Sequence, residues 1–403
     1  MTMHTPLLTR RAALLGLGAA VTLGRASLAL AAAPGDRRLV VVILRGALDG
    51  MAAVIPYGDR ELTGLRPNLV PPAPGQEGGM LDLGGFFALH PALTGLHAMY
   101  AAGQLLPVHA VAGHVRTRSH FEAQDLMESG ADQRLSSGWL NRAVQGIPTE
   151  GKAGRGAAGQ PLSIGVALPL LLRGPAPVGS YAPQSFGQPQ PDLYARLAAL
   201  HQSDPVTGPA VRQGLAERGF TGVQLAGTEP AAPRERYAFA TLAGTAGKLL
   251  AAPNGPRIAA MELGGWDTHA AQMQRLAAPL RQLDAGLAAL RDGLGDAWRQ
   301  TAVLVMTEFG RTVRSNGTGG TDHGSGTVAF VAGGAVAGGR VLADWPGLAA
   351  ARLLDGRDLQ PSLDLRSLAK GLLAGHLGLP DAALLRAFPG SEGAAPLRGL
   401  VRA

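Results

Sequence analysis

A continuous apolar run, residues 39–44 with the sequence LVVVIL, limits the fold more than any other feature of this chain. Its β-branched residues favour a strand, and the lack of polar alternation indicates burial on both faces, as in a parallel sheet. Parallel strands need long crossover connections, which are usually helices. The chain is therefore expected to alternate strands with helices.

The remaining apolar pattern shows this alternation. Further strands are predicted at 105–112, 258–263, 302–306 and 328–331. Helices are predicted at 91–102, 121–127, 139–144, 234–251, 270–294 and 364–377. Residues 148–190, rich in Gly, Pro and Ala, are predicted to form loops and short strands at the rim of the fold. These elements predict one α/β domain over residues 34–403, a doubly wound, mostly parallel sheet flanked by helices.

Residues 1–33 have the form of an export signal. Arg10 and Arg11 precede a short apolar run, and three alanines end the segment. The arginine pair favours the twin-arginine pathway, although Ala13 stands where that signal usually has a large apolar residue. A membrane anchor is the alternative, but several glycines and Arg25 interrupt the run. We expect a periplasmic or secreted protein with no stable membrane span in the mature chain.

Charge and composition exclude several kinds of partner. The net charge of +7 falls to +4 without residues 1–33, which carry three arginines and no acid. The remaining basic residues are scattered rather than clustered, and aromatic residues are only 4% of the chain, so a nucleic-acid surface is not expected. Cysteine is absent, which excludes disulfides and thiolate metal ligands.

Three clusters of acidic and histidine residues stand at the ends of predicted strands. Such side chains are costly to bury unless they are paired or bind a cation, and the carboxyl ends of parallel strands are where ligands bind in α/β sheets. Oxygen and imidazole ligands without thiolate suit a divalent metal such as Zn, Mn or Mg. The candidate ligands are Asp267, His269, Glu308, Asp322 and His323.

Each cluster also has a purely structural interpretation. Asp267 is well placed to cap the helix that follows it. Glu308 and Arg311 could form an ordinary ion pair, whereas in a functional site Arg311 would neutralise Glu308 or clamp an anionic substrate. Asp322 and His323 end a loop rich in glycine and polar residues, which could simply be a surface loop.

Two further positions are ambiguous. Ser119 stands at a predicted helix start beside Arg118, where a nucleophilic hydroxyl could act with its leaving anion held by the helix amides. Taken alone, a capping box of Ser119 with Glu122 is the better interpretation. Asp49, near the tip of the first strand, is a further candidate ligand, but Asp49 and Gly50 are also a common turn sequence.

The motifs together resemble a known family of bacterial proteins that are exported by the twin-arginine route, domain of unknown function 1501. That family is grouped with the alkaline phosphatase and sulfatase superfamily. The resemblance spans essentially the whole mature chain. It rests on RGALDGM (45–51), RSHFEAQDLMESG (118–130), GGWDTHAAQ (264–272), TEFGRTVRSNGTGGTDHGSG (307–326) and GGAVAGG (333–339).

The resemblance implies an alkaline-phosphatase-like fold and roles for particular residues. Asp267 and His269 resemble the metal-binding pair that precedes a long helix in the superfamily, and Asp284 resembles an acidic residue often found on that helix. His323 matches the position of the last metal-binding histidine. Ser119 matches the nucleophile.

The chain also departs from the superfamily pattern. Glu308 and Phe309 stand where an Asp-His pair is usual, unless Asp322 and His323 are aligned with that pair instead, which leaves the last histidine unassigned. Arg45 stands where the first strand usually ends in a metal-binding aspartate, and Asp49 follows four residues later.

Two hypotheses follow from these observations. The first is a metal-dependent hydrolase of small phosphate or sulfate esters, in which Ser119 attacks and Arg118 or Arg311 lies near the anion. The second is a non-catalytic exported binding or assembly protein that retains the hydrolase fold. A polysaccharide hydrolase with paired carboxylates ranks behind both.

Overall fold

A computed structural model describes residues 37–147, 161–183, 238–253 and 255–402, together with isolated positions between 196 and 225. The predicted export segment, residues 1–33, lies outside the described residues, as do 148–160 and 184–190 of the predicted rim segment and 234–237 of the predicted helix 234–251. No helix in the described part of the chain is both long and apolar enough to cross a membrane.

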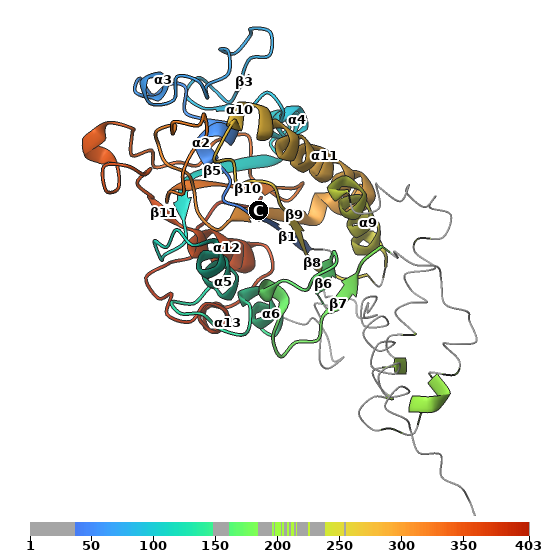
Figure 1. Ribbon diagram of the computed structural model, residues 1–403. Coiled ribbons are helices and arrows are strands. Elements are labelled where there is room, and N and C mark those ends of the chain that lie inside the picture. The colour runs from blue at the N-terminus through green and yellow to red at the C-terminus, as the bar shows by residue number, and fades with distance from the viewer. Residues whose placement is uncertain are drawn as a thin grey trace, which may run out of the picture.

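An eight-stranded sheet forms the centre of the protein (Figure 1). Its strands, in spatial order, are β11 (Leu363–Asp364), β5 (Leu105–Ala112), β10 (Thr327–Ala332), β9 (Thr301–Thr307), β1 (Arg38–Leu44), β8 (Ile258–Leu263), β6 (Leu162–Ile164) and β7 (Gly179–Tyr181). Every neighbouring pair is parallel except the two that involve β10, which runs antiparallel to β5 and to β9. The prediction of a mostly parallel α/β sheet is confirmed.

Helices cover both faces of this sheet, as a doubly wound fold requires. One face carries α4 (Thr94–Ala101), α9 (Phe239–Ala251) and α11 (Ala277–Leu294). The other carries α5 (His120–Ser129), α6 (Trp139–Val144), α12 (Leu365–Gly375) and α13 (Asp381–Ala387). The two groups lie on opposite sides of the strands in Figure 1.

Strand β1 shows why the apolar run at 39–44 is continuous. Val40, Val42 and Leu44 pack with the α9 and α11 face, whereas Val41 and Ile43 pack with the α12 and α13 face. Successive side chains of a strand point to opposite faces, so both sets must be apolar when both faces are covered. Burying each of these side chains contributes about 1.5–3 kcal/mol.

Smaller elements complete the fold. A second sheet contains β2 (Val54–Ile55), β4 (Ala88–Leu89) and β3 (Leu81–Asp82). The short helices are α2 (Gly50–Ala53), α3 (Leu62–Leu65), α10 (Gln272–Arg275) and the 3-10 turns η2 (Leu170–Leu172), η3 (Gly295–Gln300) and η4 (Ala350–Arg352).

The helix predicted over 270–294 is divided, which corrects that prediction. Helix α10 ends at Arg275 and α11 begins at Ala277. Pro279 has no N–H to donate to the carbonyl of Arg275, so the helical hydrogen bonding is interrupted between the two.

The carboxyl ends of the central strands lie level with one another. Leu44 at the end of β1 is opposite Leu263 of β8 and Thr307 of β9. The segments that leave these strands therefore meet at one edge of the sheet. Because β10 is antiparallel, the residues that precede it arrive at the same edge.

Candidate metal centre

Three histidines and one aspartate converge at this edge of the sheet. The Oδ1 atom of Asp267 lies 3.0 Å from Nε2 of His269, 3.4 Å from Nε2 of His323 and 3.6 Å from Nε2 of His120. The Nε2 atoms of His269 and His323 are 3.0 Å apart. We call these four residues the His–Asp cluster. It joins segments that follow β5 and β8 with the one that precedes β10.

In two of the three imidazoles, those of His120 and His323, the second nitrogen is held by a neighbouring acceptor. Nδ1 of His120 donates to Glu308 Oε1 at 2.8 Å, and Nδ1 of His323 donates to the carbonyl oxygen of Arg118 at 2.8 Å. Since these acceptors take the Nδ1 proton, the Nε2 lone pairs of both rings face the cluster. This arrangement is the one that metal-binding histidines use to fix their tautomer and orientation.

The donor set fits a metal ion. Ligand atoms of His120, Asp267 and His323 all lie within 4.8 Å of one another. Nε2 of His120 is buried and has no hydrogen-bond partner, which is costly unless a ligand satisfies it. His269 adds a fourth donor at the rim, because its Nε2 contacts both Asp267 and His323.

The pKa shifts of Asp267 and His323 also favour metal binding. Burial acts to raise the pKa of Asp267, but the hydrogen bond and charge of Arg311 outweigh it, and the pKa is lowered. Burial lowers the pKa of His323. Both shifts favour the deprotonated forms, which are the forms that bind metals.

A close approach of two backbone segments positions Asp267. Gly46, just after β1, has a φ of +114°, and a Cβ atom there would lie 2.9 Å from the amide nitrogen of Asp267. Only glycine tolerates both the positive φ and this contact. Its carbonyl oxygen accepts from Arg311 Nη2 at 2.6 Å, so the same guanidinium holds both segments.

Glu308 supports the cluster instead of contributing a ligand atom to it. Its Oε1 accepts from Gly46 N, His120 Nδ1 and Gln124 Nε2 at 2.8–2.9 Å, and its Oε2 accepts from Thr307 Oγ1 at 2.9 Å. Burial acts to raise the pKa of Glu308, but these donors lower it. The hydrogen bond from His120 to Glu308 in turn raises the pKa of His120, against the effect of burial.

Arg311 does not pair with Glu308, which corrects one interpretation of the sequence. Its Nη2 donates to Asp267 Oδ1 at 2.6 Å, and its other nitrogens donate to the carbonyl oxygens of Ala47 and Thr321. The side chain is buried. It therefore anchors the cluster rather than offering free donors to an anion.

Asp49 lies apart from the cluster. Its Oδ2 accepts from Arg66 Nη1 at 2.7 Å and from Gln272 Nε2 at 2.6 Å, and the side chain is only 1% exposed. Asp284 does not belong to the His–Asp cluster either. Its carboxylate accepts hydrogen bonds from the amides of Gly95 and Leu96 at the start of α4.

The remaining candidates lie at the rim. Oδ1 of Asp322 accepts from Asn316 and lies 3.5 Å from Nδ1 of His269, which places it behind that ring. Arg118 pairs through Nη2 with the buried Asp358 at 2.8 Å. Its backbone carbonyl, rather than its charge, contacts the cluster.

Ser119 directly precedes His120 and is the first residue before α5. Its side chain is exposed and makes no capping hydrogen bond, so the predicted capping box is not formed. Glu122 instead accepts from Thr117 Oγ1 at 2.7 Å. The Ser119 hydroxyl is thus not committed to the helix end.

Arg45, directly after β1, is held by two acids. Its guanidinium pairs with Glu262 and, at 2.5 Å, with Glu128. Arg45 therefore takes no part in the His–Asp cluster.

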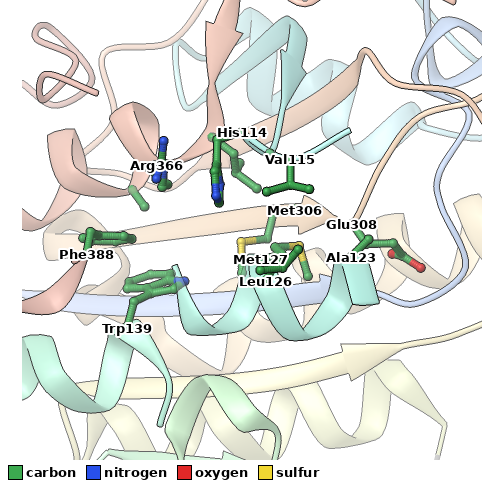
Figure 2. A pocket seen from close by; sticks show the side chains of 13 residues that line it. His114, Val115, Ala123, Leu126, Met127, Trp139, Met306, Glu308, Arg366 and Phe388 are labelled. Carbon is green, nitrogen blue, oxygen red and sulfur yellow. The ribbon is translucent and has the colours of Figure 1, made fainter. Parts of the chain in front are cut away.

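A small cavity lies on the α5 side of the sheet (Figure 2). Apolar side chains such as Met127, Met306 and Phe388 line it, and Glu308 stands at one end. Its volume of about 20 Å³ accommodates roughly one water molecule. None of the four cluster residues lines it.

His120 is the cluster residue that the sequence interpretation omitted. It lies between Ser119 and Phe121, in a segment whose hydroxyl and arginines are also candidate site groups. The available signal was its position directly after a strand-to-helix connection, on the first turn of α5. Its partner Gln124, four residues later on the same helix face, carried no signal of its own.

Comparison with known proteins supports a family assignment but no activity. A profile of the family described as Protein of unknown function (DUF1501) matches residues 104–387, which include the whole His–Asp cluster. No curated protein matches the chain.

Two solved structures resemble the chain distantly. A crystal structure of Ps i-CgsB in complex with k-i-k-neocarrahexaose is 10% identical, covers 89% of this chain and 77% of that one, and has a TM-score of 0.38. The phosphonate monoester hydrolase of Agrobacterium radiobacter is 14% identical, with coverages of 85% and 74% and a TM-score of 0.32. Since both likenesses are weak, the chemistry of the site is inferred from its own residues.

Proposed function

The chain belongs to the DUF1501 family, and we propose that it is an exported, metal-dependent hydrolase of phosphate or sulfate esters. The observation that carries this proposal is the convergence of three imidazole Nε2 atoms on one carboxylate oxygen. Imidazole nitrogens and a carboxylate oxygen turned toward one another are the donor set of a divalent-metal site. The site also lies where α/β sheets bind ligands.

The proposed metal ligands are His120, Asp267, His269 and His323. A mainly imidazole set with one carboxylate suits Zn or Mn better than Mg, which prefers oxygen ligands. A divalent cation bound there would act as a Lewis acid toward an ester oxygen and neutralise developing negative charge.

The residues around the cluster have supporting roles in this proposal. Glu308 keeps the proton of His120 on Nδ1, and the carbonyl of Arg118 does the same for His323. Arg311 keeps Asp267 ionised and in place. Asp322 steadies His269 from behind.

Ser119 is the proposed nucleophile. Its hydroxyl oxygen would form a bond to phosphorus or sulfur as the bond to the alcohol oxygen breaks, and the hydroxyl proton would reach the departing alcohol through solvent. Water would then cleave the seryl ester and release phosphate or sulfate. The amino end of the ten-residue helix α5 favours an anion at this position.

The choice of an anionic substrate rests on the cation and the helix end rather than on net charge. Asp267, Glu308 and Asp322 together balance Arg311 and a divalent cation. A bound cation would nevertheless attract an ester oxygen directly, and the amino end of α5 would favour its negative charge.

Export is proposed from the sequence. Arg10 and Arg11 before a short apolar run and three alanines support a twin-arginine signal and a periplasmic or secreted location. Fusion of residues 1–36 to a reporter that folds in the cytoplasm would test this, since the Arg10→Lys, Arg11→Lys variant should block its export.

Turnover of aryl phosphate and aryl sulfate by the zinc- or manganese-loaded protein tests the activity. Ser119→Ala should abolish turnover and leave the thermal unfolding midpoint unchanged, since the side chain is exposed and caps nothing. Ser136→Ala, another exposed serine, is the matched control. Full turnover by Ser119→Ala would remove this residue from the mechanism.

One observation favours a non-catalytic binding protein instead. Arg45 occupies the end of β1 and is held by Glu128 and Glu262, so this strand brings no ligand to the cluster. The proposed cluster would then hold one cation, without a second one to act on the leaving oxygen. A broad screen of ester substrates with metal present separates the two functions, because a binding protein would take up metal and turn over none of them.

A further inference from the structure

A chain of buried polar side chains lies behind the two loops that carry Asp267, His269 and His323. All of its members are at most 1% exposed. They are Asp49, Arg66, Thr268, Gln272 and Thr321. Their hydrogen bonds join them into one connected network.

One atom of this network contacts both loops. The side-chain oxygen Oε1 of Gln272 accepts from Thr268 Oγ1 at 2.9 Å and from Thr321 Oγ1 at 2.7 Å. Thr268 lies between Asp267 and His269 in the chain. Thr321 lies two residues before His323. Each hydroxyl therefore belongs to a loop that carries a residue of the His–Asp cluster.

The two loops are also in close backbone contact. The amide of Thr321 donates to the carbonyl of Thr268 at 3.3 Å, and the amide of Gln272 donates to the carbonyl of Gly319 at 2.9 Å. A Cβ atom at position 320 would collide with the backbone of His269. The separation of the loops is therefore set within narrow limits.

The amide nitrogen of Gln272 is held by the carboxylate of Asp49. Its Nε2 donates to Asp49 Oδ2 at 2.6 Å, and Arg66 Nη1 donates to the same oxygen at 2.7 Å. Arg66 also donates to the carbonyls of Thr312 and Val313, so its guanidinium cannot turn. A carboxylate accepts only, and it therefore forces the amide nitrogen of Gln272 toward Asp49 and the amide oxygen toward the two hydroxyls.

We infer that Gln272 is a positioning residue that sets the distance between the His269 and His323 loops and hence the geometry of the metal centre. Asp49 acts through it as the anchor, which gives this acid a role at the site without contact to the ion. The inference rests on the proposed metal centre. It does not depend on Ser119 or on the ester chemistry.

Metal affinity and metal spectroscopy test the inference. Gln272→Met keeps the length of the side chain and removes both hydrogen-bonding ends. We expect roughly ten- to a hundredfold weaker zinc binding, the usual cost of losing support behind metal ligands. The absorption spectrum of the cobalt-loaded protein should also change, because it reports ligand geometry rather than stability.

A matched control separates positioning from simple destabilisation. Asn141 is a buried amide on α6 that also makes three hydrogen bonds, to Leu172 and Ala176. Asn141→Leu should lower the unfolding midpoint while leaving zinc affinity and the cobalt spectrum as in the wild type. Thr321→Val should weaken zinc binding, and Thr321→Ser, which keeps the hydroxyl, should restore it.

The outcomes are distinct. Wild-type zinc affinity and cobalt spectrum in Gln272→Met would overturn the inference alone. If that variant does not fold, equal affinities for Thr321→Val and Thr321→Ser would overturn it. A wild-type protein that binds no zinc or cobalt would overturn the metal centre and this inference together. Metal binding without ester turnover would refute only the hydrolase activity.

Discussion

Replacing Glu308 by glutamine removes one negative charge behind the metal centre and keeps the size of the side chain. The carboxylate accepts four hydrogen bonds, of which the one from His120 Nδ1 at 2.8 Å connects it to the cluster. In Glu308→Gln the amide oxygen can keep the donors on Oε1. The amide nitrogen can donate to Thr307 Oγ1, whose own proton still has the carbonyl of Leu44 as acceptor at 2.9 Å.

The expected loss falls on metal affinity. A carboxylate behind a metal-binding histidine raises the basicity of the ring, and removing such support costs about ten- to a hundredfold in affinity, or roughly 1.4–2.7 kcal/mol. The fold should be retained, since the three donors on Oε1 keep an acceptor and Thr307 keeps the carbonyl of Leu44.

Competition for zinc with a chromophoric chelator measures this loss. Glu128→Gln is the control, because Glu128 is another buried carboxylate near the same helix face but pairs with Arg45 and the amide of Leu171. It should bind zinc like the wild type. Equal zinc affinity in Glu308→Gln and the wild type would refute the view that Glu308 supports His120.

Two further predictions concern stability rather than the metal. Burial lowers the pKa of His109 to about 4, and its Nδ1 accepts from Ala110 while Nε2 donates to Val54. Between pH 6.5 and 4 the unfolded chain takes up a proton that the folded His109 refuses, so the free energy of unfolding should fall with pH by up to about 3 kcal/mol. His109→Gln should flatten this slope in chemical denaturation, and an unchanged slope would contradict the assignment. Asp284→Ala should lower the free energy of unfolding by about 1–2 kcal/mol, because it removes the acceptor of the first amides of α4. Zinc affinity should not change. A free energy of unfolding equal to that of the wild type would show that this cap contributes nothing.

The fold was largely predictable because its signals are local. The run at 39–44 has both of its residue sets buried, so its continuous hydrophobicity alone indicates a sheet with two covered faces. The direction of β10 was not predictable. Antiparallel pairing leaves no mark on a short apolar run. It nevertheless explains why His323, which precedes β10, lies beside cluster residues that follow β5 and β8.

The site was predictable in position but not in detail. Motifs at strand ends indicate which edge of the sheet carries the chemistry, and Asp267, His269 and His323 do meet there. Which acid contacts a metal and which stands behind a histidine depends on side-chain directions. Glu308 and Asp49 are both acids just beyond strand ends, but one accepts from His120 and the other from Arg66 and Gln272.

The most direct test of the metal centre is a crystal structure of the zinc-loaded protein with diffraction recorded on both sides of the zinc absorption edge. The proposed centre requires one anomalous peak bonded to Nε2 of His120, His269 and His323 and to a carboxylate oxygen of Asp267. A zinc-soaked crystal with no peak there, or with its peak at another group of residues, would contradict it.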